Sequence, residues 1–478
     1  MKKEQILDMI GDAPDEYVKD AGEHKKRRRL PRWSKWVSGI AAILVIVLMI
    51  NTMSGIPLIV SAKSVSIASD SRKMERPKGG SDSAQFDAWR DQNAARDAIV
   101  GTAKAPISDF AALVSGEILS GVDGTNRVWS PINAYIALSM TAELAEGDTL
   151  AELLSFLNVE DVEALRSRIS AVWETVYEDN NKEISVLANS LWIDKDLAYS
   201  QEKMDILAHD YYASVYQGDL GSDRTNRAIT NWMRNKTGGL LKNRTGKVTL
   251  SENEQMLTMV STIYFQSKWA SEFNASANTQ GAFHTVDGDV QVTYMNKKGY
   301  EMYYYWGADF GAVAMPLENG SSMWFILPDE GKTVNDVLSS GEYMSLISRP
   351  YKDTASHCKW MKVNLTVPQF DVSAGIDLKS GLQRVGLTKV FDWTQRGFAS
   401  ALESKTSTYP VYLAGINQDT RVKIDEKGIV AASYIELNFG AGAAEPPNEI
   451  IDFVLDRPFV FAVTKSRLPL FVGTVNKP

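Results

Sequence analysis

Cysteine and histidine are scarce in this 478-residue chain, which contains one cysteine and four histidines. Because Cys358 stands alone, a disulfide within the chain, a cysteine-ligated metal site and a CxxC redox pair are all excluded. The histidines have no HExxH or comparable metal-ligand spacing: they are His24, His209, His284 and His357. We therefore expect no metal and no cofactor, and we interpret Cys358 as a small buried apolar side chain.

Common catalytic and nucleotide-binding motifs are also missing. The sequence has no Walker loop, no Rossmann glycine fingerprint and no G-x-S-x-G elbow. Ser356 to Lys359 fits S-x-x-K, and Lys236 to Gly238 fits K-T-G. These two occur in the reverse of the order found in β-lactamases and penicillin-binding proteins, and S-D-N is absent. The order argues against a membrane-bound hydrolase, the alternative from another functional class.

Acidic residues outnumber basic residues over most of the chain. Residues 1–36 hold ten Lys and Arg against seven Asp and Glu, a net +3, so the formal total of -8 leaves -11 for the remainder. An acidic body argues against a nucleic-acid partner. The apolar share of 44% and the charged share of 23% are those of an ordinary globular protein with a large core.

Residues 37–62 contain no charged side chain and exceed the roughly 20 apolar residues that a membrane-spanning helix needs. Seven basic residues and no acid lie between positions 25 and 35, which predicts a cytoplasmic N-terminus by the positive-inside rule. We expect a basic cytoplasmic segment at 1–36 and a single-pass anchor at 37–62. The alternative is a cleaved signal peptide, with Val60 and Ala62 at an A-x-A-like site. Either interpretation places the rest of the chain outside the cytoplasm.

Residues 63–104 are rich in Ser, Asp, Lys and Arg and lack a sustained apolar stripe. We interpret them as an extracytoplasmic stalk, with helix around Phe86 to Val100. Residues 105–478 then form one globular domain.

The globular domain changes character along its length. After Pro106, apolar residues recur at helical spacing, and Ser130-Pro131 predicts a helix start with serine as the cap. Short runs rich in branched and aromatic residues follow and predict strands: 255–265, 312–317, 323–327, 363–367, 421–424, 459–463 and 470–475. Helices early and strands late, without regular βα alternation, indicate an α+β fold with largely antiparallel sheets.

Nine short motifs occur in order along the domain. They are SPIN (130–133), ANSLW (188–192), NWMRNKTGG (231–239), IYFQSKWASEF (263–273), LPDEG (327–331), VPQF (367–370), DEKG (425–428), DRPF (456–459) and FVGTVN (471–476). Each alone is compatible with an ordinary strand or turn. As an ordered set over about residues 107–478 they resemble the serpin family of serine protease inhibitors, and with the anchor the chain resembles a bacterial membrane-anchored member.

This resemblance implies a fold, a mechanism and a partner. The fold has three mainly antiparallel β-sheets, eight or nine helices and an exposed reactive loop. The protein would be a suicide inhibitor and not an enzyme: a serine protease cleaves the loop and forms an acyl-enzyme, and the loop then inserts as a new strand into the main sheet. The uncleaved fold must therefore be metastable and held by kinetics.

The segment after Gly428 has both properties that such a loop needs. Alternate positions from Ile429 to Phe439 are mostly apolar, which is a strand pattern, and Gly440 to Pro447 is small and turn-forming, which favours protease access. The family's spacing implies a reactive bond at Gly442-Ala443, within two residues either way. Small residues there favour an elastase-like or subtilisin-like protease, whereas Phe439 would suit a chymotrypsin-like one.

Two further residue sets are implied by the resemblance. The hinge of the loop comprises Glu426, Gly428, Ile429, Ala431, Ala432 and Ser433. The residues that hold the sheet shut are Ser130, Asn133, Ser261, Trp269 and Gln418.

This sequence departs from the family pattern in both sets. Asn133 and Ser261 exchange the family's serine and asparagine, an exchange expected to keep one hydrogen bond, and Gln418 stands where many members have histidine. Ile429, Val430 and Tyr434 are bulkier than the family's hinge residues, so slow insertion would turn the protein into a substrate. The bulky hinge supports the alternative of a non-inhibitory binding or scaffold protein on the cell surface.

Overall fold

The computed structural model describes residues 58–60, 83–121, 124–179, 184–237, 257–349, 355–404, 411–429 and 447–478. Within these ranges no helix is long and apolar enough to cross a membrane. The predicted anchor lies outside them except for Leu58–Val60, which form strand β1 and pair with β6. The predicted reactive bond, Gly442-Ala443, also lies outside the described residues.

The first helix of the described part, α5 (Ser83–Leu119), is longer than the sequence predicts. It passes through Pro106 and crosses the predicted boundary between stalk and domain. Proline removes a backbone donor, but Ala103 and Ile107 on either side are fully buried, so packing keeps the helix continuous. The predicted start of α6 (Pro131–Leu144) is confirmed, because the Ser130 side chain accepts a hydrogen bond from the Asn133 amide.

Seven further α-helices are found in the described ranges. They are α7 (Gly147–Phe156), α8 (Val162–Val176), α9 (Gln201–Asp210), α10 (Asp223–Lys236), α11 (Val334–Ser340), α12 (Glu342–Ser348) and α14 (Lys379–Arg384). With α5 and α6 this makes nine, as the family resemblance implies.

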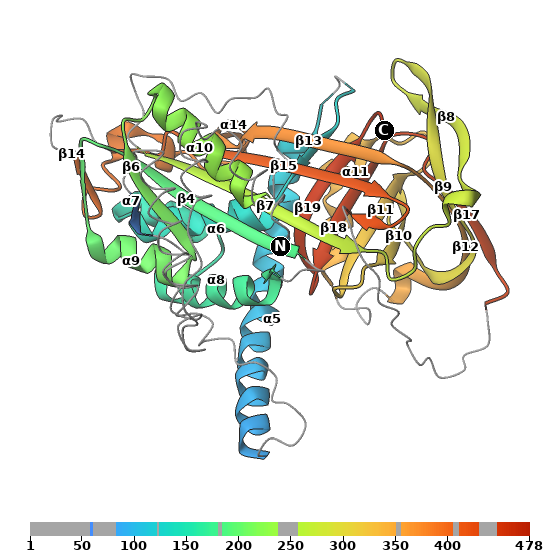
Figure 1. The fold of residues 1–478 in the computed structure, drawn as a ribbon, viewed down its shortest axis with the longest axis horizontal. Helices are drawn as coiled ribbons and strands as arrows, with labels where there is room; N and C mark the ends of the chain where they lie inside the picture. Colours follow the sequence, from blue (N-terminus) through green and yellow to red (C-terminus); the bar gives the residue numbers. More distant parts are fainter. Residues whose placement is uncertain are drawn as a thin grey trace, which may run out of the picture. The chain divides into compact units, whose positions relative to one another are not determined.

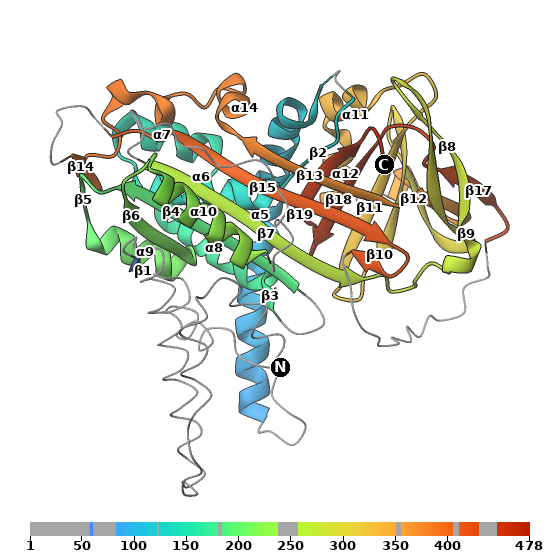
Figure 2. The same ribbon diagram turned by 45° about the horizontal axis from the view of Figure 1, so that its top comes forward.

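The main sheet has eight strands in the order β1-β6-β4-β7-β16-β15-β13, with β3 paired to β4. Its strands are β3 (Glu178–Asp179), β4 (Ile184–Asp194), β6 (Ala213–Gly218), β7 (Leu257–Lys268), β13 (Phe370–Asp377), β15 (Gly415–Asp425) and β16 (Gly428–Ile429). Figures 1 and 2 show β7 and β15 running side by side through its middle.

A second sheet of nine strands has the order β17-β12-β9-β10-β11-β18-β19-β2, with β8 paired to β9. Its strands are β2 (Arg127–Trp129), β8 (Thr279–Thr285), β9 (Gly288–Trp306), β10 (Phe310–Pro316), β11 (Ser321–Pro328), β12 (Cys358–Pro368), β17 (Ile450–Val454), β18 (Phe459–Lys465) and β19 (Leu468–Val475). Strands β5 (Leu197–Tyr199) and β14 (Leu402–Ser404) form the third sheet.

The predicted α+β class is confirmed. All strand pairings are antiparallel except β4 with β6, β7 with β15 and β12 with β17. Each strand predicted from the sequence exists, and most extend beyond the predicted limits. Cys358 is buried at the start of β12, as predicted.

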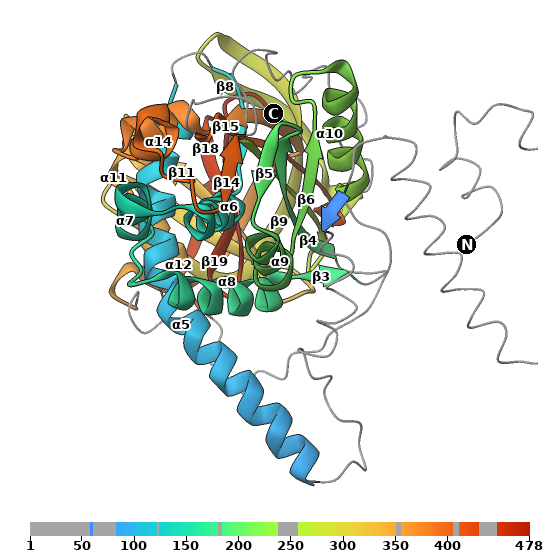
Figure 3. The same ribbon diagram turned by 90° about the vertical axis from the view of Figure 1, so that its left-hand side faces the viewer.

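Both faces of the main sheet are covered where its central strands meet. A large core joins one face to α6 and to the second sheet. On the other face α10 packs Ile229 and Trp232 against Ala188, Trp192 and Val260 of β4 and β7. Figure 3 shows α6 and α10 on opposite sides of these strands.

Helix α6 is fixed at its far end by a buried carboxylate. Glu143 is fully buried and accepts hydrogen bonds from Arg166 Nε at 2.7 Å and Lys203 Nζ at 2.8 Å. Burial alone would raise the pKa of Glu143, but the hydrogen bonds and charges of these two cations hold it below its ordinary value. These contacts tie α6 to α8 and α9, so the helix that packs against the main sheet is held in a fixed position.

Candidate functional site

Strands β7 and β15 meet directly along only part of their length. They form a parallel ladder of five residue pairs, from Thr258 with Gly415 to Thr262 with Asp419. We call this part, residues 258–262 and 415–419, the closed segment (Figure 2). Farther along, β16 lies between β7 and β15 and pairs with both of them. The two strands are therefore in direct contact at one end of the gap and separated by a third strand at the other.

The first residues of the predicted loop occupy that second part, which we call the hinge end (residues 267–269 and 424–429). Gly428 pairs with Lys268 of β7 and Asp425 of β15, and Ile429 pairs with Ser267 and Ile424. Ile429 is 2% exposed and belongs to the main core. The bulk of Ile429 is therefore accommodated between the two strands, which removes the obstacle that its size suggested.

Gly428 fits its place because it lacks a side chain. Its φ of 149° is one that other residues rarely adopt. A β-carbon there would lie under 3.0 Å from the Ser267 carbonyl oxygen and the Lys268 Cα. The three other predicted hinge residues, Ala431, Ala432 and Ser433, lie outside the described residues.

Trp269 holds the turn that leads into the hinge. Its Nε1 donates to the Asp425 carbonyl at 2.8 Å, and its amide donates to the Lys427 carbonyl at 3.1 Å. The Phe273 amide donates to the Glu426 carbonyl at 2.9 Å. The indole is 1% exposed, so these hydrogen bonds are shielded from water.

The Glu426 side chain fastens the same turn to two other segments. Its Oε1 accepts hydrogen bonds from the Asn278 amide group and from Gln369 Nε2, the latter at 2.7 Å. Partial burial would raise the pKa of Glu426, but these hydrogen bonds and Lys427 lower it below the ordinary value. The turn is thus held best when Glu426 is ionised.

Gln418 links the closed segment to the start of α6. Its Oε1 accepts from the Ser130 amide at 2.6 Å, and its Nε2 donates to the Ser130 carbonyl at 3.0 Å. Gln418 is 2% exposed and Ser130 is fully buried. The structure therefore brings these two predicted residues into direct contact, with the glutamine clamping the backbone of the helix cap.

Asn133 at the start of α6 and Ser261 in β7 do not make the predicted hydrogen bond. Both are fully buried, and their side-chain polar atoms have no partner among the described residues. The expected exchange of serine and asparagine therefore does not preserve the hydrogen bond in the described structure. Unpaired buried polar atoms of this kind carry a free-energy cost.

Sequence reasoning missed four residues of the site. Asn189 faces Ser261 across β4 and β7, and Thr420 follows the closed segment; both are buried with unpartnered side chains in the described structure. A polar residue inside an apolar strand was a usable signal for Asn189. Asn278 and Gln369 gave no signal, because only the fold brings them to Glu426.

Comparison with known proteins gives one consistent result. A family model described as serpin (serine protease inhibitor) matches residues 105–478. Serpin-ZX of Arabidopsis thaliana is 27% identical over 372 residues, covering 74% of this chain and 92% of the relative. Plasminogen activator inhibitor 1 of Sus scrofa is 25% identical over 381 residues, covering 78% and 91%.

Solved structures show the same fold. The native state of the thermophilic serpin tengpin matches with a TM-score of 0.67 and 25% identity, covering 78% of this chain and 93% of that one. Human thyroxine-binding globulin matches with a TM-score of 0.68 and 20% identity, covering 80% and 99%.

Proposed function

The chain belongs to the serpin (serine protease inhibitor) family, whose members are not enzymes, and we propose that it inhibits serine proteases as a suicide substrate. The observation that carries this proposal is the seating of Gly428 and Ile429 between β7 and β15. The loop that a protease would cleave thus begins as a strand already paired on both edges, at the place where it would insert.

The register of β16 supports insertion of the following residues. Ile429 pairs with Ser267 and Ile424, so a continued strand would set Ala431 between Phe265 and Val422. Both of these are core residues, 5% and 1% exposed.

In the same register, every second residue after Ile429 would lie on the core face of the main sheet. Leu437 would lie between Met259 and Ile416, which are also buried in the main core. The mostly apolar alternation from Ile429 to Phe439 therefore follows the core face of the main sheet, and Ile435 would lie there between the polar Ser261 and Gln418.

Insertion would exchange a short ladder for two longer ones. It would break the five pairs of the closed segment and pair about ten further residues on both edges. At about 0.5 to 1.5 kcal/mol per hydrogen bond, the gain is on the order of 10 kcal/mol, with apolar burial in addition. A gain of this size would favour the inserted loop over the uncleaved arrangement.

The proposal includes a place and a target. We propose a bacterial cell-surface inhibitor held by the apolar segment 37–62, with its N-terminus in the cytoplasm and residues 105–478 outside. Because Leu58–Val60 pair with β6, the part of this segment that crosses the membrane would end before Leu58. The reactive bond is Gly442-Ala443, and the target is an elastase-like or subtilisin-like serine protease, because small residues fit a shallow pocket. No nucleic-acid partner is involved.

The test is to mix the full-length chain with one protease of each type and to analyse the products by denaturing gel and mass spectrometry. We expect a denaturation-resistant complex and a released C-terminal peptide beginning near Ala443. Complete cleavage without a complex would instead support a non-inhibitory binding or scaffold role on the cell surface.

Two neighbouring variants test the register itself. Ala431→Arg would place a charge between Phe265 and Val422 in the core, and we expect it to be cleaved without forming a complex. Ala432→Arg would place the same charge beside Tyr264 and Arg421, which are half-buried on the opposite face, and we expect it to keep most of the complex. Equal effects of the two variants would refute the register.

A further inference from the structure

Five stretches of the chain match the pattern Asn-x-Ser/Thr, the acceptor motif for N-linked oligosaccharides on proteins outside the cytoplasm. They begin at Asn235, Asn243, Asn274, Asn319 and Asn364, and Asn243 lies outside the described residues. Sugar transfer requires an accessible asparagine Nδ2 in a segment that an enzyme can reach. The fold therefore decides which of the other four asparagines can react.

Asn274 meets both requirements. It is exposed and precedes η1 (Ala275–Ala277), a short 3-10 helix whose three residues are also exposed. Asn274 Oδ1 accepts hydrogen bonds from the Ser276 amide at 3.0 Å and from the Ser276 hydroxyl at 2.8 Å. Because both bonds use Oδ1, the Nδ2 atom keeps no hydrogen-bond partner among the described residues. This surface turn thus leaves the amide nitrogen available to an enzyme.

Two of the other asparagines are held in regular secondary structure. Asn235 lies in the last turn of α10, and Thr237 of its motif is 2% exposed, with Oγ1 donating to the Met233 carbonyl at 2.9 Å. Asn364 lies in β12, and its Nδ2 donates to Asp452 Oδ1 of β17 at 2.8 Å. Reaction at either asparagine would require the end of a helix or part of the second sheet to open.

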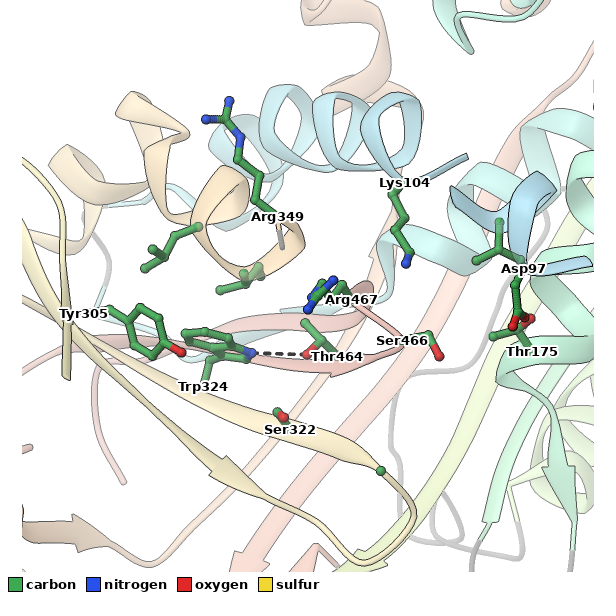
Figure 4. A pocket seen from close by; sticks show the side chains of 14 residues that line it. Asp97, Lys104, Thr175, Tyr305, Ser322, Trp324, Arg349, Thr464, Ser466 and Arg467 are labelled. Carbon is green, nitrogen blue, oxygen red and sulfur yellow. Dashed lines mark hydrogen bonds between the residues drawn. The ribbon is translucent and has the colours of Figure 1, made fainter. Parts of the chain in front are cut away.

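Asn319 is the informative comparison, because its local turn is similar. Its Oδ1 accepts a hydrogen bond from the Ser321 amide at 3.1 Å. However, its Nδ2 is buried, and Ser321 is 1% exposed. The turn stands at the cavity drawn in Figure 4, which Gly320 lines. Asn274 and Asn319 therefore share a motif and a turn but differ in access to the nitrogen that would react.

We propose that Asn274 is the N-glycosylation site of the folded domain. The donor is an oligosaccharide linked to a polyprenyl pyrophosphate, and the enzyme is an extracytoplasmic oligosaccharyltransferase. Asn274 Nδ2 forms the bond to C1 of the first sugar, and the bond between C1 and the phosphate oxygen breaks. The pyrophosphate leaves with the electron pair of that bond, and one amide proton passes to a base of the enzyme. This proposal rests on the extracytoplasmic location proposed above and not on protease inhibition.

The position of Asn274 gives the glycan a role. Phe273 and Asn278, on either side of the site, both donate hydrogen bonds to Glu426 in the turn at the hinge end. The glycan would therefore stand beside this turn without belonging to the reactive loop. Because proteases attack exposed turns, it would protect the hinge end while the loop stays accessible.

The first test is sugar transfer to the purified full-length chain carrying Asn243→Gln. It uses a purified oligosaccharyltransferase that accepts any Asn-x-Ser/Thr, together with the lipid-linked donor, and peptide mass spectrometry locates the product. Each rate is divided by that of a synthetic peptide with the same motif, so that sequence preference cancels. We expect transfer to Asn274 at least about tenfold faster than to Asn319, where reaction requires local opening. No transfer to Asn274, or an equal rate at Asn319, would overturn the proposal.

Substitutions assign the product to the motif. Asn274→Gln and Ser276→Ala should abolish transfer at this position, whereas Ser276→Thr keeps the hydroxyl and should keep the reaction. Asn364→Gln is the matched control and should react like the parent. All four variants should keep the parent's thermal unfolding. Transfer that persists in Ser276→Ala would contradict the site.

The second test separates the site from the location. The full-length chain is expressed in a bacterium whose oligosaccharyltransferase, the same enzyme as above, faces the outside of the cytoplasmic membrane. We expect the glycan on Asn274 in these cells. Transfer to the purified chain without transfer in the cells would contradict the extracytoplasmic location and uphold the site, whereas failure in both would refute the site.

Discussion

The hinge end and the closed segment occupy the same gap between β7 and β15 but are held in opposite ways. At the hinge end, hydrogen bonds surround the turn: Trp269 and the Glu426 side chain each make two, and β16 is paired on both edges. In and beside the closed segment, one glutamine clamps the helix cap, while the buried side chains of Asn133, Ser261, Asn189 and Thr420 have no hydrogen-bond partner in the described structure.

The difference indicates which region lowers the stability of the uncleaved fold. Each unpartnered buried polar group costs about 1 to 3 kcal/mol, so the closed segment is weaker than its central position suggests. The hinge end lowers the stability of the fold only a little, because the first two loop residues are already packed there. For the insertion proposed above, we infer that opening of the closed segment, and not entry of the hinge, is the slow step.

The largest expected effect is at Gly428. Gly428→Ala combines an unfavourable φ with a β-carbon that collides with the backbone of Ser267 and Lys268. We expect a loss of about 3 kcal/mol in unfolding free energy, measured by thermal unfolding, and faster amide exchange at Ile429. Gly299→Ala is the control, because its φ is also positive at 61° but no atom lies within 4 Å of the added carbon. A similar loss in both variants would mean that the seating of β16 is unimportant.

Gln418 should have the next largest effect. Gln418→Ala leaves the buried Ser130 amide without its acceptor, whereas the Ser130 carbonyl keeps the Ala134 amide at 3.2 Å. One orphaned donor predicts a loss of about 2 kcal/mol, together with faster amide exchange in residues 258–262. Asn417→Ala, the neighbour whose amide makes only a 3.5 Å contact with Thr258, should change stability by less than about 0.5 kcal/mol. Slow exchange in the Gln418 variant would show that the clamp does not control the closed segment.

Acid should loosen the hinge end through Glu426. Its pKa in the folded protein is lower than the ordinary 4.5, so its stabilising contribution is complete above pH 4.5 and is lost as the pH falls through the folded value. We expect the NMR signal of the Trp269 indole N–H, which donates to the Asp425 carbonyl, to report loosening of the turn below pH 4.5. Glu426→Gln should cost about 1 kcal/mol at pH 7 and remove this acid transition. A transition that persists in the variant would assign it to another carboxylate.

Local chemistry made part of this arrangement predictable from the sequence. The Ser130-Pro131 cap and the glycine turn at Gly428 depend on residues next to each other in the chain, and the strands follow from their branched and aromatic side chains. Continuity of α5 through Pro106 was not predictable, because it depends on packing by residues far away in sequence.

The contacts that determine how firmly each of the two regions is held were even harder to predict from the sequence. Seating of Ile429 beside Ser267 joins residues more than 150 positions apart, and Glu426 meets Asn278 over a similar separation. The failed exchange of Asn133 and Ser261 shows the same limit, since residue types alone do not fix whether two side chains reach each other.

The smallest effect should have the opposite sign and tests the unpartnered groups directly. Ser261→Ala removes a buried hydroxyl that makes no hydrogen bond in the described structure, so we expect no loss of stability and a gain of up to about 1 kcal/mol in thermal unfolding. Ser190→Ala, on the adjacent strand, is the matched control: its hydroxyl accepts from Trp192 Nε1 at 2.8 Å and donates to the Val260 carbonyl at 3.2 Å, so its removal should cost about 1 kcal/mol. If the two variants lose equally, the Ser261 hydroxyl is satisfied in solution and the closed segment is not the costly region. If they differ in sign, slower loop insertion in Ser261→Ala should follow, because the closed segment would then have less to gain by opening.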